Sequence, residues 1–152
     1  MIHRASITSP VGPLTLVEED GAIISLDWDA SGGAPETPVL RQAMAELERY
    51  FSGGAENFSA PLNPRGNPFQ QKFYAALRDI PYGETRTYGE LASKLSVSAQ
   101  AIGQACGANP IAILIPCHRV LGANGLGGFS GRGGVEAKVT LLKLEGAASL
   151  LI

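Results

Sequence analysis

The order of apolar and polar residues predicts strands at the start of the chain and helices in the rest of it. Apolar runs at 14–17 and 22–28 flank the turn Glu19-Asp20-Gly21, which predicts a hairpin within a strand region from residue 7 to residue 28. The period then changes, because Thr37 can cap a helix and Pro38 suits its first turn. Apolar residues recur at helical spacing and form a stripe that we assign to the core: Leu40, Ala43, Met44, Leu47, Tyr50 and Phe51.

A boundary between two domains is predicted in the stretch after this helix. Gly53 and Gly54 end the helix, and residues 55–66 contain two prolines and no regular period. We therefore divide the chain into a small strand-rich domain, residues 1–64, and a helical domain, residues 65–152.

The second domain is predicted to begin with a helix at Asn67-Pro68, by the same capping logic. Two short helices follow at 88–95 and about 99–107, and their outline is that of a DNA-reading helix-turn-helix, which many helical hairpins share. A last helix at 135–144 is expected to bury Val135, Val139 and Leu142. The expected fold class is α+β: a small N-terminal β-sheet/helix domain and a C-terminal helical domain with a winged-helix-like helix-turn-helix.

The second of the two short helices has an unusual composition. Ala99, Gly103 and Gly107 share one face at four-residue spacing, with Gln100 and Gln104 beside them. Each glycine inside a helix costs about 1 kcal/mol relative to alanine, so something should offset the cost. Close packing against another helix and close approach to an external surface both explain the pattern.

Composition narrows the class of protein. Of the 152 residues 45% are hydrophobic, which favours a packed core over disorder, and no apolar run reaches the roughly 18 residues that span a bilayer. Two cysteines are too few for a disulfide framework, and the first residues lack a signal-peptide pattern. We expect a soluble, cytoplasmic protein with no membrane partner.

The net charge of −2 conceals an asymmetry between the halves. Residues 1–64 hold three basic and nine acidic residues, a net charge of −6, whereas residues 65–152 hold nine and five, a net charge of +4. A polyanionic partner would therefore meet the second half, although a charge of +4 also suits an ordinary solvated surface.

The chemistry of the chain concentrates between Ile111 and Val120. Five apolar residues run into Pro116, which fixes its own φ, and Cys117, His118 and Arg119 follow directly. A lone cysteine is usually a small buried apolar residue, but a positive neighbour or an adjacent base converts a thiol into a thiolate nucleophile. The sequence therefore predicts a reactive Cys117.

A glycine-rich loop follows this segment. Six of the ten residues from 125 to 134 are glycine, yet neither the P-loop nor the dinucleotide-binding pattern is present. The loop is predicted to form a pocket whose backbone approaches a ligand closely.

These residues resemble the active-site signature of the O6-alkylguanine-DNA alkyltransferases, also called methylated-DNA–protein-cysteine methyltransferases. The likeness rests on Pro-Cys-His-Arg-Val at 116–120, Asn-Pro at 109–110, Tyr-Gly-Glu-Thr-x-Thr-Tyr-Gly-Glu-Leu-Ala at 82–92 and Leu-Leu-x-Leu-Glu-Gly at 141–146, and it covers nearly the whole chain. It implies repair of guanine alkylated at O6, by irreversible transfer of the alkyl group to a cysteine in one turnover, with no cofactor.

The resemblance also implies roles for individual residues. Cys117 would accept the alkyl group, His118 would act as the general base through a bridging water, and Glu145 would orient the imidazole. Asn109 would tie the turn before the cysteine, and Tyr88 would donate a hydrogen bond to the departing guanine. Each residue also has a structural alternative: a surface acid for Glu145, an ordinary Asn-Pro turn for Asn109 and a half-buried aromatic side chain for Tyr88.

The implied partner is double-stranded DNA containing O6-alkylguanine, bound by a monomer. The flipped base would enter a pocket formed by Phe129, Ser130 and Gly131. The second helix would lie in the minor groove, where small residues fit a width of about 6 Å. Residues assigned to DNA contact are Ala99, Gln100, Gly103, Gln104 and Arg119, the last with a structural or phosphate role.

The chain departs from the family pattern in places. Gln100 stands where the family carries an arginine that fills the gap left by the flipped base, so we expect weaker DNA binding and a less favourable flip. Phe129 replaces a common tyrosine, and the loop after it is longer than usual. His3 is the only candidate zinc ligand in the N-terminal half, so no metal is expected.

Two other functions remain as alternatives. A non-catalytic lesion-binding or signalling protein could share the fold, but members of that type lack the cysteine. A thiol hydrolase would need a different arrangement from a cysteine and a histidine adjacent in sequence.

Overall fold

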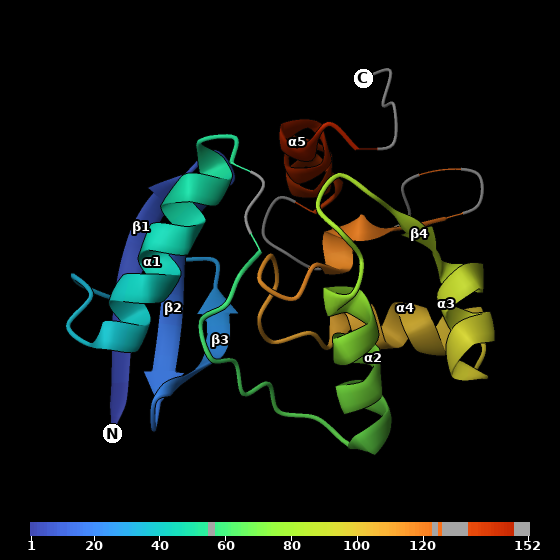
Figure 1. Cartoon of the computed structure of the whole chain (residues 1–152), viewed down its shortest axis with the longest axis horizontal. Coiled ribbons are helices and arrows are strands. Elements are labelled where there is room, and N and C mark those ends of the chain that lie inside the picture. The colour runs from blue at the N-terminus through green and yellow to red at the C-terminus, as the bar shows by residue number, and fades with distance from the viewer. Residues whose placement is uncertain (55–56, 123–124, 126–133, 148–152) are drawn as a thin grey trace.

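The computed structural model describes residues 1–54, 57–122, 125 and 134–147, and it has two parts (Figure 1). One part is an antiparallel sheet in the order β1 (Ile2–Ser9), β2 (Gly12–Glu19) and β3 (Ala22–Asp27), with α1 (Pro38–Phe51) packed against it. The other part is mostly helical. The α+β class predicted from the sequence is confirmed.

The first strand begins earlier than the sequence indicated, at Ile2 and not near residue 7. Of residues 2–6 only Ala5 is fully buried, so the hydrophobic pattern of this stretch is weak. The strand pairs with β2 along its whole length, from Ile2 opposite Glu19 to Ser9 opposite Gly12. This pairing, and not the local hydrophobic pattern, stabilises its first residues as a strand.

Helix α1 forms as its sequence predicts. The Thr37 hydroxyl accepts a hydrogen bond from the backbone N–H of Leu40 at 3.1 Å, and Pro38 occupies the first turn. Gly53 follows the helix with φ +91°, a conformation that glycine adopts without strain. The predicted stripe faces the sheet and is buried, apart from a partly buried Phe51.

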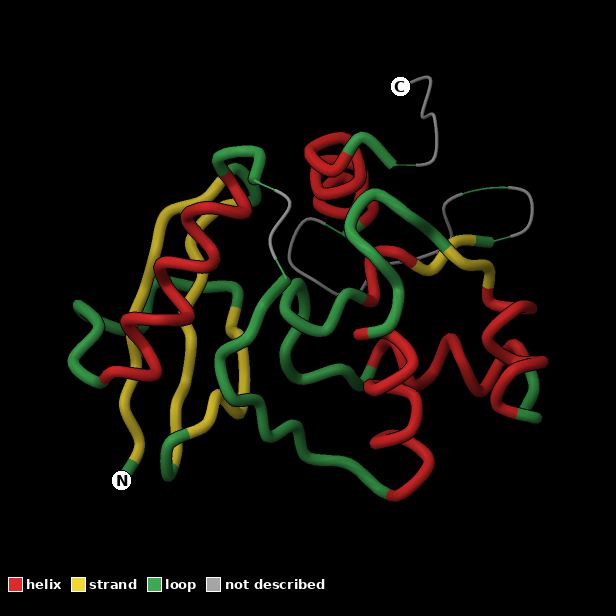
Figure 2. The backbone as a smooth tube through the Cα atoms, in the orientation of Figure 1, coloured by secondary structure: helices red, strands yellow, loops and turns green. Residues whose placement is uncertain are grey.

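The connection between the two parts is fixed along the edge of the sheet, although it has no regular structure (Figure 2). Ile23 of β3 donates to the carbonyl of Pro61 and accepts from the N–H of Asn63, both at 2.8 Å. The buried carboxylate of Glu46 accepts hydrogen bonds from Ser59 and from the N–H of Ala60. These bonds hold the connection against the first part, and one apolar core runs through both parts.

The second part contains α2 (Pro68–Arg78), β4 (Arg86–Thr87), α3 (Tyr88–Leu95), α4 (Ala99–Gly107), the 3-10 turn η1 (Cys117–Arg119), β5 (Val120–Leu121) and α5 (Val135–Glu145). Asn67, Thr87 and Ser98 cap α2, α3 and α4 through their side chains, the first two in full capping boxes. Helices α3 and α4 pack together through a tight turn, and β4 pairs with β5. The predicted helix-turn-helix is therefore present.

The buried face predicted for α5 was wrong at its start. Val135 is 44% exposed and Val139 only partly buried, whereas Leu142 is buried as expected. The actual inner face includes two charged residues, Lys138 and Glu145, which apolar periodicity does not identify as buried. None of the described helices is long and apolar enough to cross a membrane.

Candidate active site

The backbone before Cys117 is a compact, buried turn. Ile113 has φ +74°, and the N–H of Leu114 donates to the carbonyl of Ala112 at 2.9 Å, which together describe a γ-turn of the positive-φ type. Positive φ is a strained conformation for a β-branched residue. All five residues from 111 to 115 are buried, as the sequence predicted, and tertiary packing holds the strained turn in place.

A second tight turn places the thiol. Pro116 has φ −81° and ψ 68°, and the N–H of Cys117 donates to the carbonyl of Ile115 at 2.8 Å, which is an inverse γ-turn. Asn109 spans the segment, because its amide nitrogen donates to the carbonyl of Ile115 at 2.8 Å and its oxygen accepts from the N–H of Ile111 at 3.0 Å. Asn109, which was expected to tie the turn before the cysteine, thus bonds both ends of the segment from Ile111 to Ile115.

Cys117 sits in a low-dielectric site with few groups that favour a thiolate. Its residue surface is 4% exposed, and burial raises the pKa of its thiol. A hydrogen bond from Asn109 and the positive charge of Lys138 act in the opposite direction and are smaller. The resting side chain is therefore a neutral thiol that needs a base.

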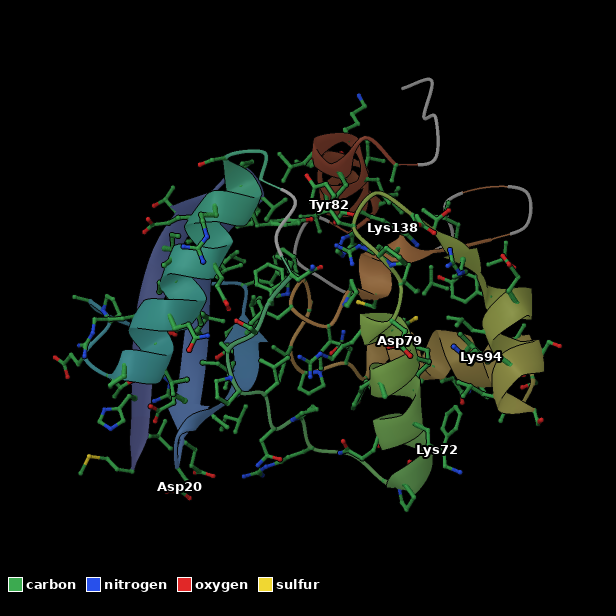
Figure 3. All side chains as sticks on the ribbon, in the orientation of Figure 1. Asp20, Lys72, Asp79, Tyr82, Lys94 and Lys138 are labelled. Atoms are coloured by element: carbon green, nitrogen blue, oxygen red, sulfur yellow. The ribbon has the colours of Figure 1, made fainter. Side chains whose placement is uncertain are left out.

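Lys138 is a buried cation that the sequence interpretation missed. The side chain is labelled in Figure 3. Its ammonium donates to the carbonyl of Val120 at 2.6 Å and lies 5.8 Å from the centre of the Tyr88 ring. Burial lowers its pKa, while Cys106 and Cys117 act to raise it. The lysine therefore connects the region around the thiol with the tyrosine assigned to the leaving group.

The base assigned to Cys117 is fully buried and oriented by a carboxylate. His118 Nε2 lies 2.6 Å from Glu145 Oε2, and both side chains are 0% exposed. With Nε2–H donating to the carboxylate, Nδ1 carries the lone pair, and Nδ1 has no hydrogen-bond partner among the described residues. Burial lowers the pKa of His118 against the raising effect of Glu145, so the imidazole is neutral and can accept a proton.

Within the described part of the chain, five hydrogen bonds reach Glu145. Besides His118, the donors are Nε and Nη2 of Arg119 at 2.9 and 3.1 Å, the N–H of Gly83 at 3.1 Å and the hydroxyl of Tyr50 at 2.6 Å. Burial alone would raise the pKa of the carboxyl, but bonds from His118, Arg119 and Tyr50 lower it to about 2. The carboxylate stays ionised and its position is over-determined.

Arg119 is bound inside the protein, which favours the structural one of the two roles considered for it, while contact with DNA phosphate stays an untested prediction. Its side chain is 7% exposed, forms a two-pronged ion pair with Glu145 and donates to the carbonyl of Ile80 at 2.8 Å. A guanidinium committed to a buried carboxylate and a backbone carbonyl supports the structural role.

The small residues of α4 face open space. Ala99, Gln100, Gly103, Gln104 and Gly107 are all exposed, whereas Ile102 and Ala105 point inward. A Cβ added at either glycine would meet no atom within 4 Å among the described residues. Packing within the described structure therefore does not account for the glycines, and close approach to an external surface stays a prediction.

Of the other residues assigned to the site from the sequence, the structure describes some and not others. Tyr88 opens α3 and is half-buried beside Lys138. Phe129, Ser130 and Gly131, the expected pocket residues, lie outside the described residues. The sequence interpretation placed Tyr50 only in the core, and nothing in its helical spacing indicated the contact with Glu145, a residue 95 positions away.

Comparison with known proteins assigns both parts of the chain. Residues 2–64 match the 6-O-methylguanine DNA methyltransferase ribonuclease-like domain, and residues 68–147 match the DNA binding domain of the same family. A methylated-DNA–protein-cysteine methyltransferase of Mycobacterium leprae is 43% identical over 95% of this chain and 93% of its own. One from Haemophilus influenzae is 45% identical over 90% and 82%. A crystal structure of Mycobacterium tuberculosis OGT in complex with DNA superposes with a TM-score of 0.82 at 42% identity, covering 95% of this chain and 92% of that one.

Proposed function

The chain belongs to the 6-O-methylguanine DNA methyltransferase family, and we propose that it takes the alkyl group of O6-alkylguanine in DNA onto Cys117. Its activity is that of a methylated-DNA–protein-cysteine methyltransferase, which repairs DNA by alkyl transfer. The observation that carries the assignment of residues is the buried pair His118–Glu145, whose histidine directly follows Cys117 in the sequence. Glu145 Oε2 holds His118 Nε2 at 2.6 Å, and His118 Nδ1, which has no hydrogen-bond partner among the described residues, can accept a proton.

The proposed reaction begins from a neutral thiol and a neutral imidazole. His118 takes the proton of Cys117 through a bridging water, and the thiolate attacks the sp3 carbon on O6 in line. The S–C bond forms as the C–O6 bond breaks, and its electron pair goes to guanine. Tyr88 donates a hydrogen bond to the departing guanine anion, which then recovers a proton from the imidazolium. Each protein molecule reacts once, because the thioether has no route back to a thiol.

Before transfer the lesion must leave the stack, at a cost of a few kcal/mol. We assign the minor-groove contact to the exposed face of α4, where Ala99 and the two glycines leave room for close approach. Residues 1–64 and 65–152 act as the two domains of a monomer. A reactive thiol that works once is best preserved in a reducing compartment, which supports a cytoplasmic location.

The test is the intact mass of the protein after mixing with a duplex that contains O6-methylguanine. Wild-type protein should gain one CH2 in mass in stoichiometric yield, and Cys106→Ser should behave the same. Cys117→Ser should bind the duplex and gain nothing. Binding by the wild type without a mass gain would instead support the non-catalytic lesion-binding alternative, and a gain retained in Cys117→Ser would move the acceptor elsewhere.

A further inference from the structure

A side chain from the N-terminal part of the molecule reaches the proposed proton relay. Tyr50 lies in the last turn of α1, yet its hydroxyl donates to Glu145 Oε2 at 2.6 Å and lies 3.4 Å from His118 Nε2. One carboxylate oxygen therefore accepts from both the imidazole and the phenol. We propose that Tyr50 is a positioning residue of the alkyl-transfer reaction, which sets the basicity of His118 by sharing the oxygen of Glu145 that holds the imidazole.

The ring of Tyr50 is held in one orientation. It is 0% exposed and packs against three aromatic rings, with centroid distances of 5.3 Å to Phe51, 5.5 Å to Phe58 and 6.0 Å to Tyr82. Burial and the charge of Glu145 raise the pKa of its phenol above the ordinary value, so it remains a donor at every working pH. A locked, permanently protonated donor suits a positioning role better than a proton-transfer role.

The charge balance around Glu145 explains what the phenol does. Arg119 forms a two-pronged ion pair with the carboxylate, and Lys138 adds a second positive charge that acts on the imidazole. Each donor to Glu145 draws charge from the oxygen that would otherwise stabilise imidazolium. Removing the hydroxyl of Tyr50 should therefore strengthen the pull of Glu145 on a proton at His118 and raise the pKa of the imidazole.

The aromatic cluster contains a matched control. Tyr82, which is labelled in Figure 3, also donates a hydrogen bond from a partly buried hydroxyl, but to the carbonyl of Leu144 at 3.2 Å and not to the carboxylate. Its ring borders that of Tyr50 and lies 5.9 Å from the guanidinium of Arg119. Tyr82→Phe thus removes a hydroxyl from the same cluster without changing the donors to Glu145.

The experiment measures single-turnover alkyl transfer across a range of pH for wild type, Tyr50→Phe and Tyr82→Phe. Because a higher imidazole pKa leaves more of His118 protonated near neutral pH, Tyr50→Phe should slow transfer about three- to tenfold there and move the acid limb of the pH–rate profile to higher pH. Affinity for the lesion duplex, measured in a Cys117→Ser background, should not change. Tyr82→Phe should keep the wild-type profile even where its thermal stability falls.

A second variant covers the case in which Tyr50→Phe does not fold. A chain with 3-fluorotyrosine at position 50 keeps the ring packing but has a more acidic phenol and hence a stronger donor, so its acid limb should move downward. An unchanged acid limb in both variants, or the same shift in Tyr82→Phe, would overturn the inference. The inference rests on the proposed function, but the failures differ: a wild type that gains no alkyl group refutes the function, whereas normal transfer with an unmoved profile refutes only the role of Tyr50.

Discussion

At the scale of single residues, the site is built to keep a thiol neutral until a base takes its proton. Burial raises the pKa of the Cys117 thiol above its ordinary value, and the opposing effects of Asn109, Lys138 and a backbone hydrogen bond do not reverse it. We predict no thiolate absorbance from Cys117 at pH values below its ordinary pKa. In Lys138→Met, which lacks the positive charge, the pKa of the Cys117 thiol should be higher still. Ultraviolet titration in a Cys106→Ser background checks both. A step near neutral pH that disappears in Cys117→Ser would indicate a preformed thiolate–imidazolium pair.

The relay should also make the protein sensitive to acid. The pKa of Glu145 is about 2 in the folded state against an ordinary 4.5, so its contribution to stability is present above pH 4.5 and is lost as pH falls toward 2. This difference corresponds to about 3 kcal/mol. The lowered pKa of His118 acts in the same direction below pH 6.5, because the unfolded chain binds the proton first.

Urea unfolding at neutral and acid pH measures this effect. Glu145→Gln should be less stable than wild type at neutral pH, since it leaves Arg119 buried without its counter-charge, and its stability should depend less on pH. Glu84→Gln changes an exposed carboxylate and should retain the wild-type dependence. Parallel curves for wild type and Glu145→Gln would show that another group controls the acid transition.

At the scale of elements, the helices were predictable where their signals are local. Thr37, Asn67, Thr87 and Ser98 each cap the helix that follows, and the spacing of apolar residues gave the inner face of α1. The inner face of α5 was not predictable, because its buried lysine and glutamate are satisfied by partners far away in sequence. The contact between Tyr50 and Glu145 was not predictable for the same reason, because the two residues are 95 positions apart in the sequence. Local pattern thus predicts an element, but not which of its polar atoms the tertiary fold will bury.

Helix α4 should show a trade-off between stability and DNA binding. Gly103 is exposed, and a Cβ added there would meet no atom of the described residues within 4 Å, so Gly103→Ala should stabilise the protein by up to about 1 kcal/mol through helix propensity. The added methyl should weaken binding to duplex DNA if this face enters a narrow groove. Thermal melts and binding isotherms test the pair of effects. Gly89→Ala, at an exposed position of α3, is the matched control and should leave affinity unchanged.

Gln100 makes a separate prediction for the same exposed face. Arginine adds charge and a planar group that can stack where the base has left, so Gln100→Arg should bind lesion duplex more tightly and transfer the alkyl group faster. Gln104→Arg adds the same charge one turn away and controls for simple attraction to phosphate. Unchanged affinity and rate in Gln100→Arg, or equal gains in both variants, would count against a role in filling the gap.

At the scale of the whole molecule, the two parts are joined through backbone and side chains at once. Leu26 of β3 donates to the carbonyl of Pro110 at 2.9 Å, directly before the turn that carries Cys117. Tyr50 adds the bond to Glu145, and the apolar core is continuous across the junction. A disturbance at the thiol is therefore expected to reach both parts and not only the helical one.

Alkylation of Cys117 provides such a disturbance. Cys117 is only 4% exposed and follows two tight turns. The first of these turns already holds Ile113 at a strained, positive φ. An added group in a close-packed site typically costs about 1–3 kcal/mol, and about 1 kcal/mol lowers Tm by about 2–4 °C in a protein of this size. The methylated protein should therefore melt several degrees lower than the free protein, and a benzylated one lower still. Cys117→Ser treated with the same DNA should keep its Tm, and because the junction is shared, the loss should appear as one cooperative transition. A methylated protein that melts at the same temperature as the free protein would mean that the site has room for the alkyl group. Alkylation would then leave the stability of the fold unchanged.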